Sequence, residues 1–312
     1  MPSGYSNFNM VEFGGLVEAE FQERNMIGRD MMQFFDMTGK NTLKIPVVGS
    51  LSAGFADPLS DRTASPSNVG VSRSLVLDKA FEIPQTLSDE VLAQNSWDLM
   101  ASQATQMGGD LAEAMQSLWV NYVYNSTNSA RQFSGEIADG SSSIGEKTAA
   151  LIREVKTAFD RAKLPKGPEY NKMLLDPTQF NALHGVEEVS SVDYGGTADA
   201  KRFGQNGLYY AGFHILQAVT GFREDRSSDT TLLAKYRANT TNLRGIAWNT
   251  RGFAQGAVSG QNWSTQVTIE RIGHKQGYLL LGRWFGDHTW IHGHTHDQDE
   301  TTALAAANIL TA

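Results

Sequence analysis

The chain contains no cysteine and only 8 prolines among its 312 residues. The absence of cysteine excludes disulfide bonds, thiolate zinc sites and cysteine nucleophiles, so stability has to come from packing or from assembly. No stretch approaches the roughly 18 uninterrupted apolar residues of a membrane-spanning helix, and we expect no membrane partner. Positive charge is also scarce, because 26 lysines and arginines face 34 acidic residues for a formal net charge of -8. Nucleic-acid phosphates and anionic lipids would repel such a chain, which argues against a dedicated DNA reader.

The remaining composition is that of a folded protein. Hydrophobic residues make up 40% of the chain, and 30 glycines indicate many turns. A chain of this length can bury a substantial core in one large or two medium domains. The first residues, MPSGYSNFNMVEFGG, contain neither the basic nor the apolar region of a secretory signal, so we expect synthesis in the cytoplasm.

The amino-terminal part predicts a helix with a strongly apolar face. Helix formers occupy residues 10–36, where Phe13, Val17 and Phe21 recur at helical spacing and Phe34 and Phe35 follow. A terminal helix with this much apolar surface needs a neighbour to cover it. We therefore expect this arm to lack a partner in its own chain and to lie on another molecule.

Residues 42–84 predict a long two-stranded excursion from the body of the protein. The runs TLKIPVVGSL and VSRSLVLDKAFEIP have strand character, and a segment rich in glycine, serine, proline and aspartate separates them. In the second run Arg73, Leu75 and Leu77 alternate with Ser74 and Val76, a period-2 pattern that predicts weak burial on either face. Because an isolated hairpin is marginal in water, we expect this one to lie on another molecule.

The clearest helix lies between residues 89 and 123. Ser88 or Asp89 can cap it, and apolar residues recur at steps of three or four throughout. If continuous, it would be on the order of 50 Å long. Gly108 and Gly109 interrupt the pattern, and each costs up to about 1 kcal/mol in a helix. Two interpretations stay open: a hinge at this point, or a tolerated glycine pair.

The second half of the chain predicts mixed helix and strand followed by strands. Residues 146–163 predict an amphipathic helix, and Pro165 prevents it from continuing. An apolar strand over 170–175 follows. Asp176 and Pro177 then predict the cap and first residue of a short helix. Residues 207–219 read as a single apolar strand. From residue 243 onward the pattern indicates antiparallel strands.

The segment HTWIHGHTHDQDE concentrates histidines near the carboxyl end. In an extended strand the four imidazoles would share one face with the indole of Trp290; these histidines are His288, His292, His294 and His296, and the acids Asp297, Asp299 and Glu300 follow. The order departs from the HxHxDH pattern of metallo-hydrolases. We predict the end of a surface strand, with no catalytic, cofactor-binding or metal-binding residue; a catalytic metal, an adventitious metal and a pH-sensitive interface remain alternatives.

The segment GSSSIGEKT nearly matches a phosphate-binding loop. Glu146 is inserted between Gly145 and Lys147, which moves the lysine out of register and places a carboxylate where a phosphate would bind. No apolar strand precedes it. We therefore predict a serine-rich helix cap and no nucleotide cofactor.

The order of these elements resembles that of the Hong Kong 97-type major capsid proteins of tailed bacteriophages. LKIPVVGSLSAGF with RSLVLDKAFEIPQTLSD is similar to the extended loop of that family, and QNSWDLMASQATQMGGDLAEAM to its spine helix. ALIREVKTAFDRAKLPKGPEYNKMLLDPTQFNALHG is similar to a passage of the axial domain, most closely in short-tailed (podovirus-like) phages. GLYYAGFHILQAVTGF resembles the step that follows it.

The resemblance implies an α+β phage capsid fold. Its parts would be an N-terminal arm, an extended β-hairpin loop, a peripheral domain that carries the long spine helix, and an axial α/β domain. The implied boundaries are 1–41 for the arm, 42–86 for the extended loop, 87–142 and 241–285 for the peripheral domain, and 143–240 and 286–312 for the axial domain.

The resemblance also implies a structural function and not an enzymatic one. The chain would form homo-hexamers and homo-pentamers of an icosahedral shell that encloses phage double-stranded DNA without sequence-specific binding. The amino-terminal extension that carries the scaffold in some members is absent, so a separate scaffolding protein is expected, together with a portal protein; the resemblance leaves open whether a decoration protein binds. The location would be the virion, with assembly in the host cytoplasm.

Two further expectations concern chemistry and alternatives. Self-crosslinking members use a lysine of the extended loop, and residues 49–78 contain arginine but no lysine, so covalent crosslinking of the shell is not expected. A cellular encapsulin-like nanocompartment has the same fold and is the first alternative. A histidine-dependent metal hydrolase is the second.

Overall fold

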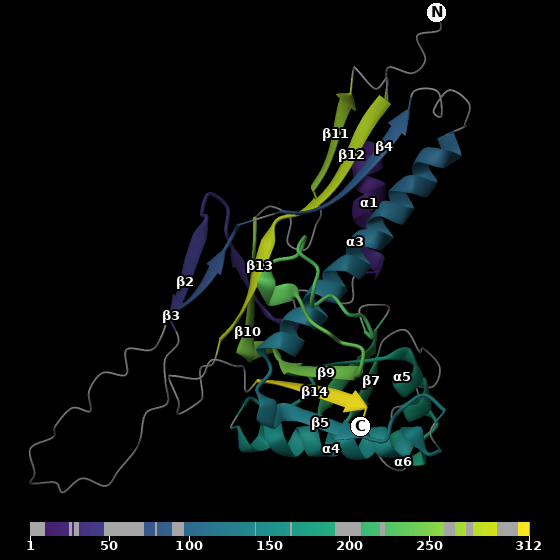
Figure 1. The fold of residues 1–312 in the computed structure, drawn as a ribbon, viewed down its shortest axis with the longest axis vertical. Coiled ribbons are helices and arrows are strands. Elements are labelled where there is room, and N and C mark those ends of the chain that lie inside the picture. The colour runs from purple at the N-terminus through teal and green to yellow at the C-terminus, as the bar shows by residue number, and fades with distance from the viewer. Residues whose placement is uncertain are drawn as a thin grey trace, which may run out of the picture.

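The fold is that of a computed structural model, which describes residues 10–24, 27, 31–46, 72–78, 80–88, 97–140, 142–162, 164–190, 207–218, 222–258, 266–272, 277–291 and 305–311. The described part is elongated (Figure 1). A long helix runs along one end, a six-stranded sheet with helices forms the other, and a two-stranded hairpin projects to the side.

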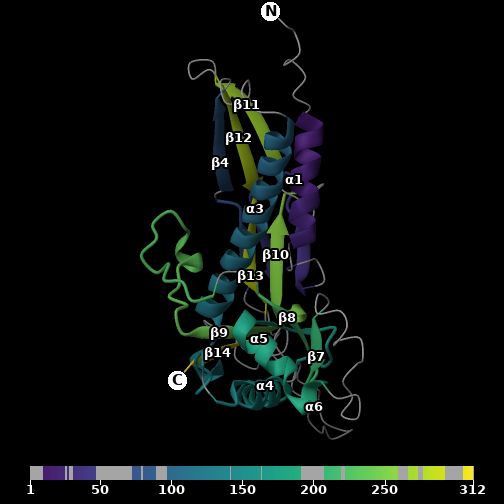
Figure 2. The same ribbon diagram turned by 90° about the vertical axis from the view of Figure 1, so that its right-hand side faces the viewer.

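The long helix organises the upper half of the molecule. Helix α3 (Trp97–Ser126) spans 30 residues without interruption, and α1 (Met10–Arg24) lies alongside it in both ribbon views (Figures 1 and 2). A three-stranded antiparallel sheet, in the order β11 (Gln266–Ile272), β12 (Gly277–Trp284) and β4 (Phe81–Ser88), packs on the same helix. Gly282 allows this approach, since a Cβ there would lie 2.7 Å from Cδ1 of Leu111.

A second three-stranded sheet occupies the middle of the molecule. Its order is β1 (Gln33–Asp36), β10 (Phe253–Ala257) and β13 (Gly286–Trp290). Strand β1 runs parallel to β10, and β13 runs antiparallel to it. Next to β13 lies the separate two-stranded hairpin of β2 (Thr42–Pro46) and β3 (Ser72–Val76).

The six-stranded sheet forms the lower half. Its order is β5 (Gln132–Gly135), β14 (Ala306–Thr311), β9 (Leu243–Asn249), β6 (Asn171–Leu175), β8 (Phe213–Gln217) and β7 (Leu208–Tyr210). The helices of this half are α4 (Ile144–Arg161), α5 (Pro177–His184) and α6 (Glu187–Ser190), and the short 3-10 turns are η3 (Ser129–Arg131), η5 (Ala234–Tyr236) and η6 (Thr250–Gly252).

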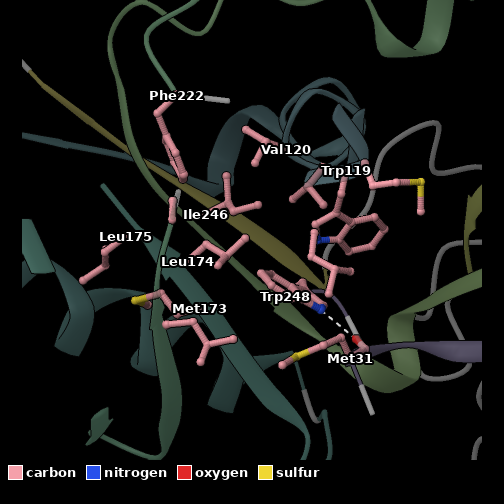
Figure 3. Packing of buried hydrophobic residues seen from close by; sticks show 14 of the residues in the cluster. Met31, Trp119, Val120, Met173, Leu174, Leu175, Phe222, Ile246 and Trp248 are labelled. Carbon is pink, nitrogen blue, oxygen red and sulfur yellow. Dashed lines mark hydrogen bonds between the residues drawn. The ribbon is translucent and has the colours of Figure 1, made fainter. Parts of the chain in front are cut away.

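One hydrophobic core joins the long helix to this sheet. Trp119 and Val120 of α3 face Ile246 and Trp248 of β9, and Met173 and Leu174 of β6 lie beside them (Figure 3). The indole Nε1–H of Trp248 donates a hydrogen bond to the backbone oxygen of Met31 at 2.7 Å. Because that indole is fully buried, this bond removes the cost of an unpaired donor and ties the amino-terminal segment to the core.

Several sequence predictions are confirmed. The chain is α+β, and the strand predicted at 170–175 is β6. Helix α4 lies where a helix was expected at 146–163. The side chain of Asp176 accepts a hydrogen bond from the backbone N–H of Thr178, so Asp176 caps α5 and Pro177 is its first residue.

Three predictions about elements are wrong. The run that was expected to be one strand up to Pro84 is two strands, since β3 pairs with β2 whereas β4 pairs with β12. The single strand expected at 207–219 is a tight hairpin of β7 and β8, because Ala211 and Gly212 both adopt positive φ, of 50° and 78°. Residues 33–36 form β1 and do not extend the amino-terminal helix.

The domain boundaries implied by the resemblance stay a prediction, but two sheets cross them. Strand β9 falls in the range 241–285 and β5 in the range 87–142, whereas their sheet partners β6 and β14 fall in the other domain. Strand β13 in turn pairs with β10 across the boundary at residue 286. Within the described residues, no helix is long and apolar enough to span a membrane.

Candidate functional site

His288 is a core residue and not part of a surface strand end, so that prediction is wrong for it. It is 2% exposed in the middle of β13. Its ring lies 5.2 Å from the ring of Trp119 and 5.3 Å from that of Trp284. Its Nδ1 lies 3.1 Å from the hydroxyl oxygen of Tyr236. Burial, and secondarily the charge of Lys235, lowers the pKa of His288 to about 3, so its imidazole is neutral at physiological pH.

The other histidines of the predicted cluster, His292, His294 and His296, lie outside the described residues, as do Asp297, Asp299 and Glu300. Among the residues that are described, no group of three histidine or acidic side chains is placed to hold a metal ion. His288 itself points into an aromatic cluster and shares no such group.

The segment that resembles a phosphate-binding loop is committed to packing. Gly145 lies inside α4, where a Cβ would come within 2.4 Å of the backbone oxygen of Ala182, so this glycine allows α4 to approach α5. The ammonium group of Lys147 lies 2.7 Å from a carboxylate oxygen of Glu136. Ser143 precedes the helix, as a cap would, but its side chain makes no capping hydrogen bond.

The hairpin of β2 and β3 is the feature with the strongest functional character. Its two strands pair only with each other among the described strands, and the residues between them, 47–71, lie outside the described part. Its base packs in a small hydrophobic cluster that is separate from the main core; the cluster contains Met37, Ile45, Leu75, Leu77, Ala254 and Ile291. The guanidinium carbon of Arg73 lies 3.7 Å from the ring centroid of Trp290.

The alternation predicted for β3 is confirmed, but the predicted weak burial is wrong. Leu75 is fully buried and Leu77 is buried, whereas Ser74 and Val76 are exposed. The inward face of β3 is therefore attached to the body. The base of the hairpin is thus held in a fixed position on the body of the protein.

The amino-terminal helix has a partner in its own chain, contrary to the sequence prediction. Phe13, Val17 and Phe21 are buried in the main core, where α1 packs along α3. Gly108 makes this possible, because a Cβ there would lie 2.6 Å from the backbone oxygen of Val17. At Gly109 a Cβ would meet the guanidinium group of Arg24 at 2.8 Å. The glycine pair is a site of close helix packing, and α3 continues through it as a helix.

Sequence reasoning missed a buried ionic centre beside the hairpin. The carboxylate of Asp287 is 3% exposed and pairs with the ammonium group of Lys235. The two residues are far apart in the chain, and neither belongs to a motif. The only local signal was an acidic residue inside a strand-like segment, GDHTW.

Comparison with known proteins identifies the fold. No model of a known protein family matches the chain, and no curated protein is significantly similar to it in sequence. Solved structures are similar, however. The capsid structure of the cyanophage P-SCSP1u is 18% identical, with a TM-score of 0.68 over 91% of this chain and 87% of that one. The mature capsid of bacteriophage PhiM1 is 9% identical, with a TM-score of 0.64 over 91% and 86%.

A third similar structure is described as a virus-like particle and not as a phage capsid. The virus-like particle from Pyrococcus furiosus is 11% identical, with a TM-score of 0.54 over 96% of this chain and 98% of that one. At these identities the likeness concerns the fold alone, and it extends over nearly the whole of each chain. The chain therefore has the α+β fold of phage capsid proteins.

Proposed function

We propose that the protein is a major capsid protein, a structural subunit that assembles with copies of itself into the shell of a bacteriophage. The hairpin of β2 and β3 is the observation that carries this proposal. Among the described strands, β2 and β3 pair only with each other, their base is fixed to the body, and 25 residues, 47–71, connect them. Loops of β-hairpins usually have about two to five residues, so a connection of this length is uncommon unless it is functional.

The finer assignment is of the Hong Kong 97 type with podovirus-like affinity. The subunits would form hexamers and pentamers that close into an icosahedral shell around double-stranded DNA, since closed symmetry satisfies every copy of a repeated contact. The net charge of -8 suits a container wall, because a wall that attracted the genome would hinder its packing and release. The likeness to two phage capsids over about nine tenths of the chain supports this assignment.

The division of labour within the subunit is part of the proposal. The arm would comprise residues 1–41, the extended loop 42–86, and the peripheral and axial domains the remainder. A separate scaffolding protein and a portal protein would be the partners in the host cytoplasm, with a decoration protein as an open alternative, and the virion would be the final location. No enzymatic activity, metal or cofactor is assigned to the subunit.

A second candidate function is an encapsulin-like compartment in a cell. The likeness to the virus-like particle from Pyrococcus furiosus supports it, although with a lower TM-score than the phage capsids. The two functions differ in the contents of the particle. DNA inside purified particles would favour the phage shell, and a cargo enzyme would favour the compartment.

Sedimentation velocity of the purified full chain, alone and with co-expressed proteins from its own genome, tests the proposal. We expect a boundary far larger than a subunit, accompanied by capsomers of five or six copies. A single compact monomer under all of these conditions would contradict a shell function. A histidine-dependent hydrolase would instead give a monomer with stoichiometric metal that is lost on substitution of His292, His294 and His296.

A further inference from the structure

The hairpin of β2 and β3 is attached to the body by side chains and not by a backbone ladder. Strand β3 lies against β13, but the described hydrogen-bonded neighbours of β3 are limited to β2. Apolar contacts of the small cluster around Leu75 hold the base. Such contacts are non-directional, so the angle of the hairpin depends on the polar contacts beside it, which include the guanidinium group of Arg73 over the ring of Trp290.

The carboxylate of Asp287 is a buried polar group that reaches the hairpin. Its Oδ2 accepts a hydrogen bond from the backbone N–H of Val76 in β3 at 2.9 Å. Its Oδ1 accepts from the backbone N–H of His288 at 2.8 Å, from the hydroxyl of Tyr236 at 3.2 Å and from the ammonium group of Lys235. A buried carboxylate is tolerated only when several donors form hydrogen bonds to it. Loss of one donor to Asp287 therefore weakens its interactions with the others.

Two of the donors, Lys235 and Tyr236, belong to turn η5. The turn is held in place by the long helix, since the amide of Asn125 donates to the backbone oxygens of Lys235 and Arg237 at 3.2 and 2.7 Å. Figure 2 shows the segment that contains the turn beside the lower part of α3. The ammonium group of Lys235 is also attracted by Asp78 at the end of the hairpin, which opposes the burial that lowers the pKa of Lys235 to about 8.

We propose that Asp287 fixes the direction of the hairpin and couples it to turn η5, so that loss of the turn's donors releases the hairpin. One carboxylate on β13 accepts from β3 through Oδ2 and from η5 through Oδ1. The released hairpin keeps its own pairing, because the β2–β3 ladder and the bond from Leu77 N–H to the oxygen of Asn41 do not involve Asp287. The β2–β3 hairpin therefore moves relative to β13 as one unit.

Hydrogen exchange with residue resolution on dissociated full-length subunits tests this coupling. The reporter is the amide of Val76, and the amide of Leu77 is the internal reference. The first variant is Lys235→Met, which keeps the apolar stem and removes a donor on the turn. The second is Asp287→Asn, which keeps the shape and removes the charge. The matched control is Lys156→Met: Lys156 is 33% exposed against 34% for Lys235 and also pairs with an aspartate.

We expect exchange at Val76 to accelerate about tenfold or more in Asp287→Asn, the effect of losing a charge-assisted hydrogen bond. Lys235→Met should accelerate it in the same direction, while Leu77 stays within about twofold of the wild type and Lys156→Met changes neither amide. The double variant should exceed Asp287→Asn by less than the Lys235→Met effect, because the two residues act through one carboxylate.

Unchanged exchange at Val76 in Lys235→Met would overturn the coupling. Equal acceleration at Val76, at Leu77 and throughout helix α4 would also overturn it, since that is the signature of a merely destabilised fold. If Asp287→Asn does not fold, Lys235→Met decides alone. The inference rests on the proposed function only for the use of the hairpin: wild-type chains that form no shells would refute the function, while the exchange result would still stand.

Discussion

Acidification should destabilise the subunit through His288. Its folded pKa of about 3 lies below the ordinary value of 6.5, because the fully buried ring cannot accept a proton without losing solvation. In the unfolded chain the same imidazole takes up a proton as the pH falls below 6.5. Protonation thus favours the unfolded state, and the stability contributed above pH 6.5 is lost progressively as the pH falls from 6.5 towards 3.

The size of this loss follows from the two pKa values. At pH 5 the pH is about 1.5 units below the pKa of the unfolded imidazole, which is therefore protonated, whereas the folded imidazole is still neutral. This difference lowers the free energy of unfolding by about 2 kcal/mol. His288→Phe should remove this dependence, because phenylalanine keeps an aromatic ring against Trp119 and does not titrate. The hydroxyl of Tyr236 keeps an acceptor in the variant, since Asp287 lies 3.2 Å away.

Urea unfolding of dilute full-length subunits, followed by tryptophan fluorescence at pH 7 and pH 5, measures the difference. The wild type should lose about 2 kcal/mol more between the two pH values than His288→Phe does. Phe253→Leu serves as the control, because it removes packing against Trp119 but no titrating group. It should lower the free energy of unfolding equally at both pH values. Equal pH dependence in the wild type and His288→Phe would refute the burial argument.

Three further predictions concern packing, capping and assembly. Gly108→Ala should lower the free energy of unfolding by about 1–3 kcal/mol, because its Cβ meets the backbone of α1. At Gly109→Ala the Cβ meets only a flexible arginine, so this variant should be neutral or stabilising by up to about 1 kcal/mol. Urea unfolding compares the two variants, and equal effects would contradict the packing role of Gly108. Asp176→Ala should cost about 1–2 kcal/mol of thermal and urea stability through loss of the α5 cap, in addition to the loss of its ion pair with Arg223, and an unchanged midpoint would count against it. Deleting residues 54–68 should leave circular dichroism unchanged but abolish closed particles, and normal particles would show that this segment is not an assembly contact.

Local signals in the sequence predicted elements well where one short motif decides the structure. The pair Asp176–Pro177 defines the start of α5 because a capping carboxylate and a fixed φ act on neighbouring residues. The apolar spacing along α3 likewise predicts a helix, but it left a hinge at Gly108 open; the helix continues there, since two glycines cost less than the packing of thirty residues returns. The overall order of elements was sufficient to suggest the capsid fold.

Predictions failed where distant parts of the chain decide the outcome. Alternation in β13 places His288 and Trp290 on one face but does not say that α3 covers this face. The apolar stripe around Val17 predicts a partner, and only the three-dimensional arrangement identifies it as α3 of the same chain. Asp287 and Lys235 could not be paired from sequence, because 51 residues separate them and an ion pair has no periodicity.

Reconstruction of purified particles by electron cryomicroscopy tests the central claim most directly. We predict closed icosahedral shells in which β2 and β3 of each subunit extend from its body onto a neighbouring copy. Helix α1 should stay against α3 of its own chain. Particles in which the hairpin contacts no other copy, or a protein that remains monomeric on the grid with and without its co-expressed partners, would contradict it.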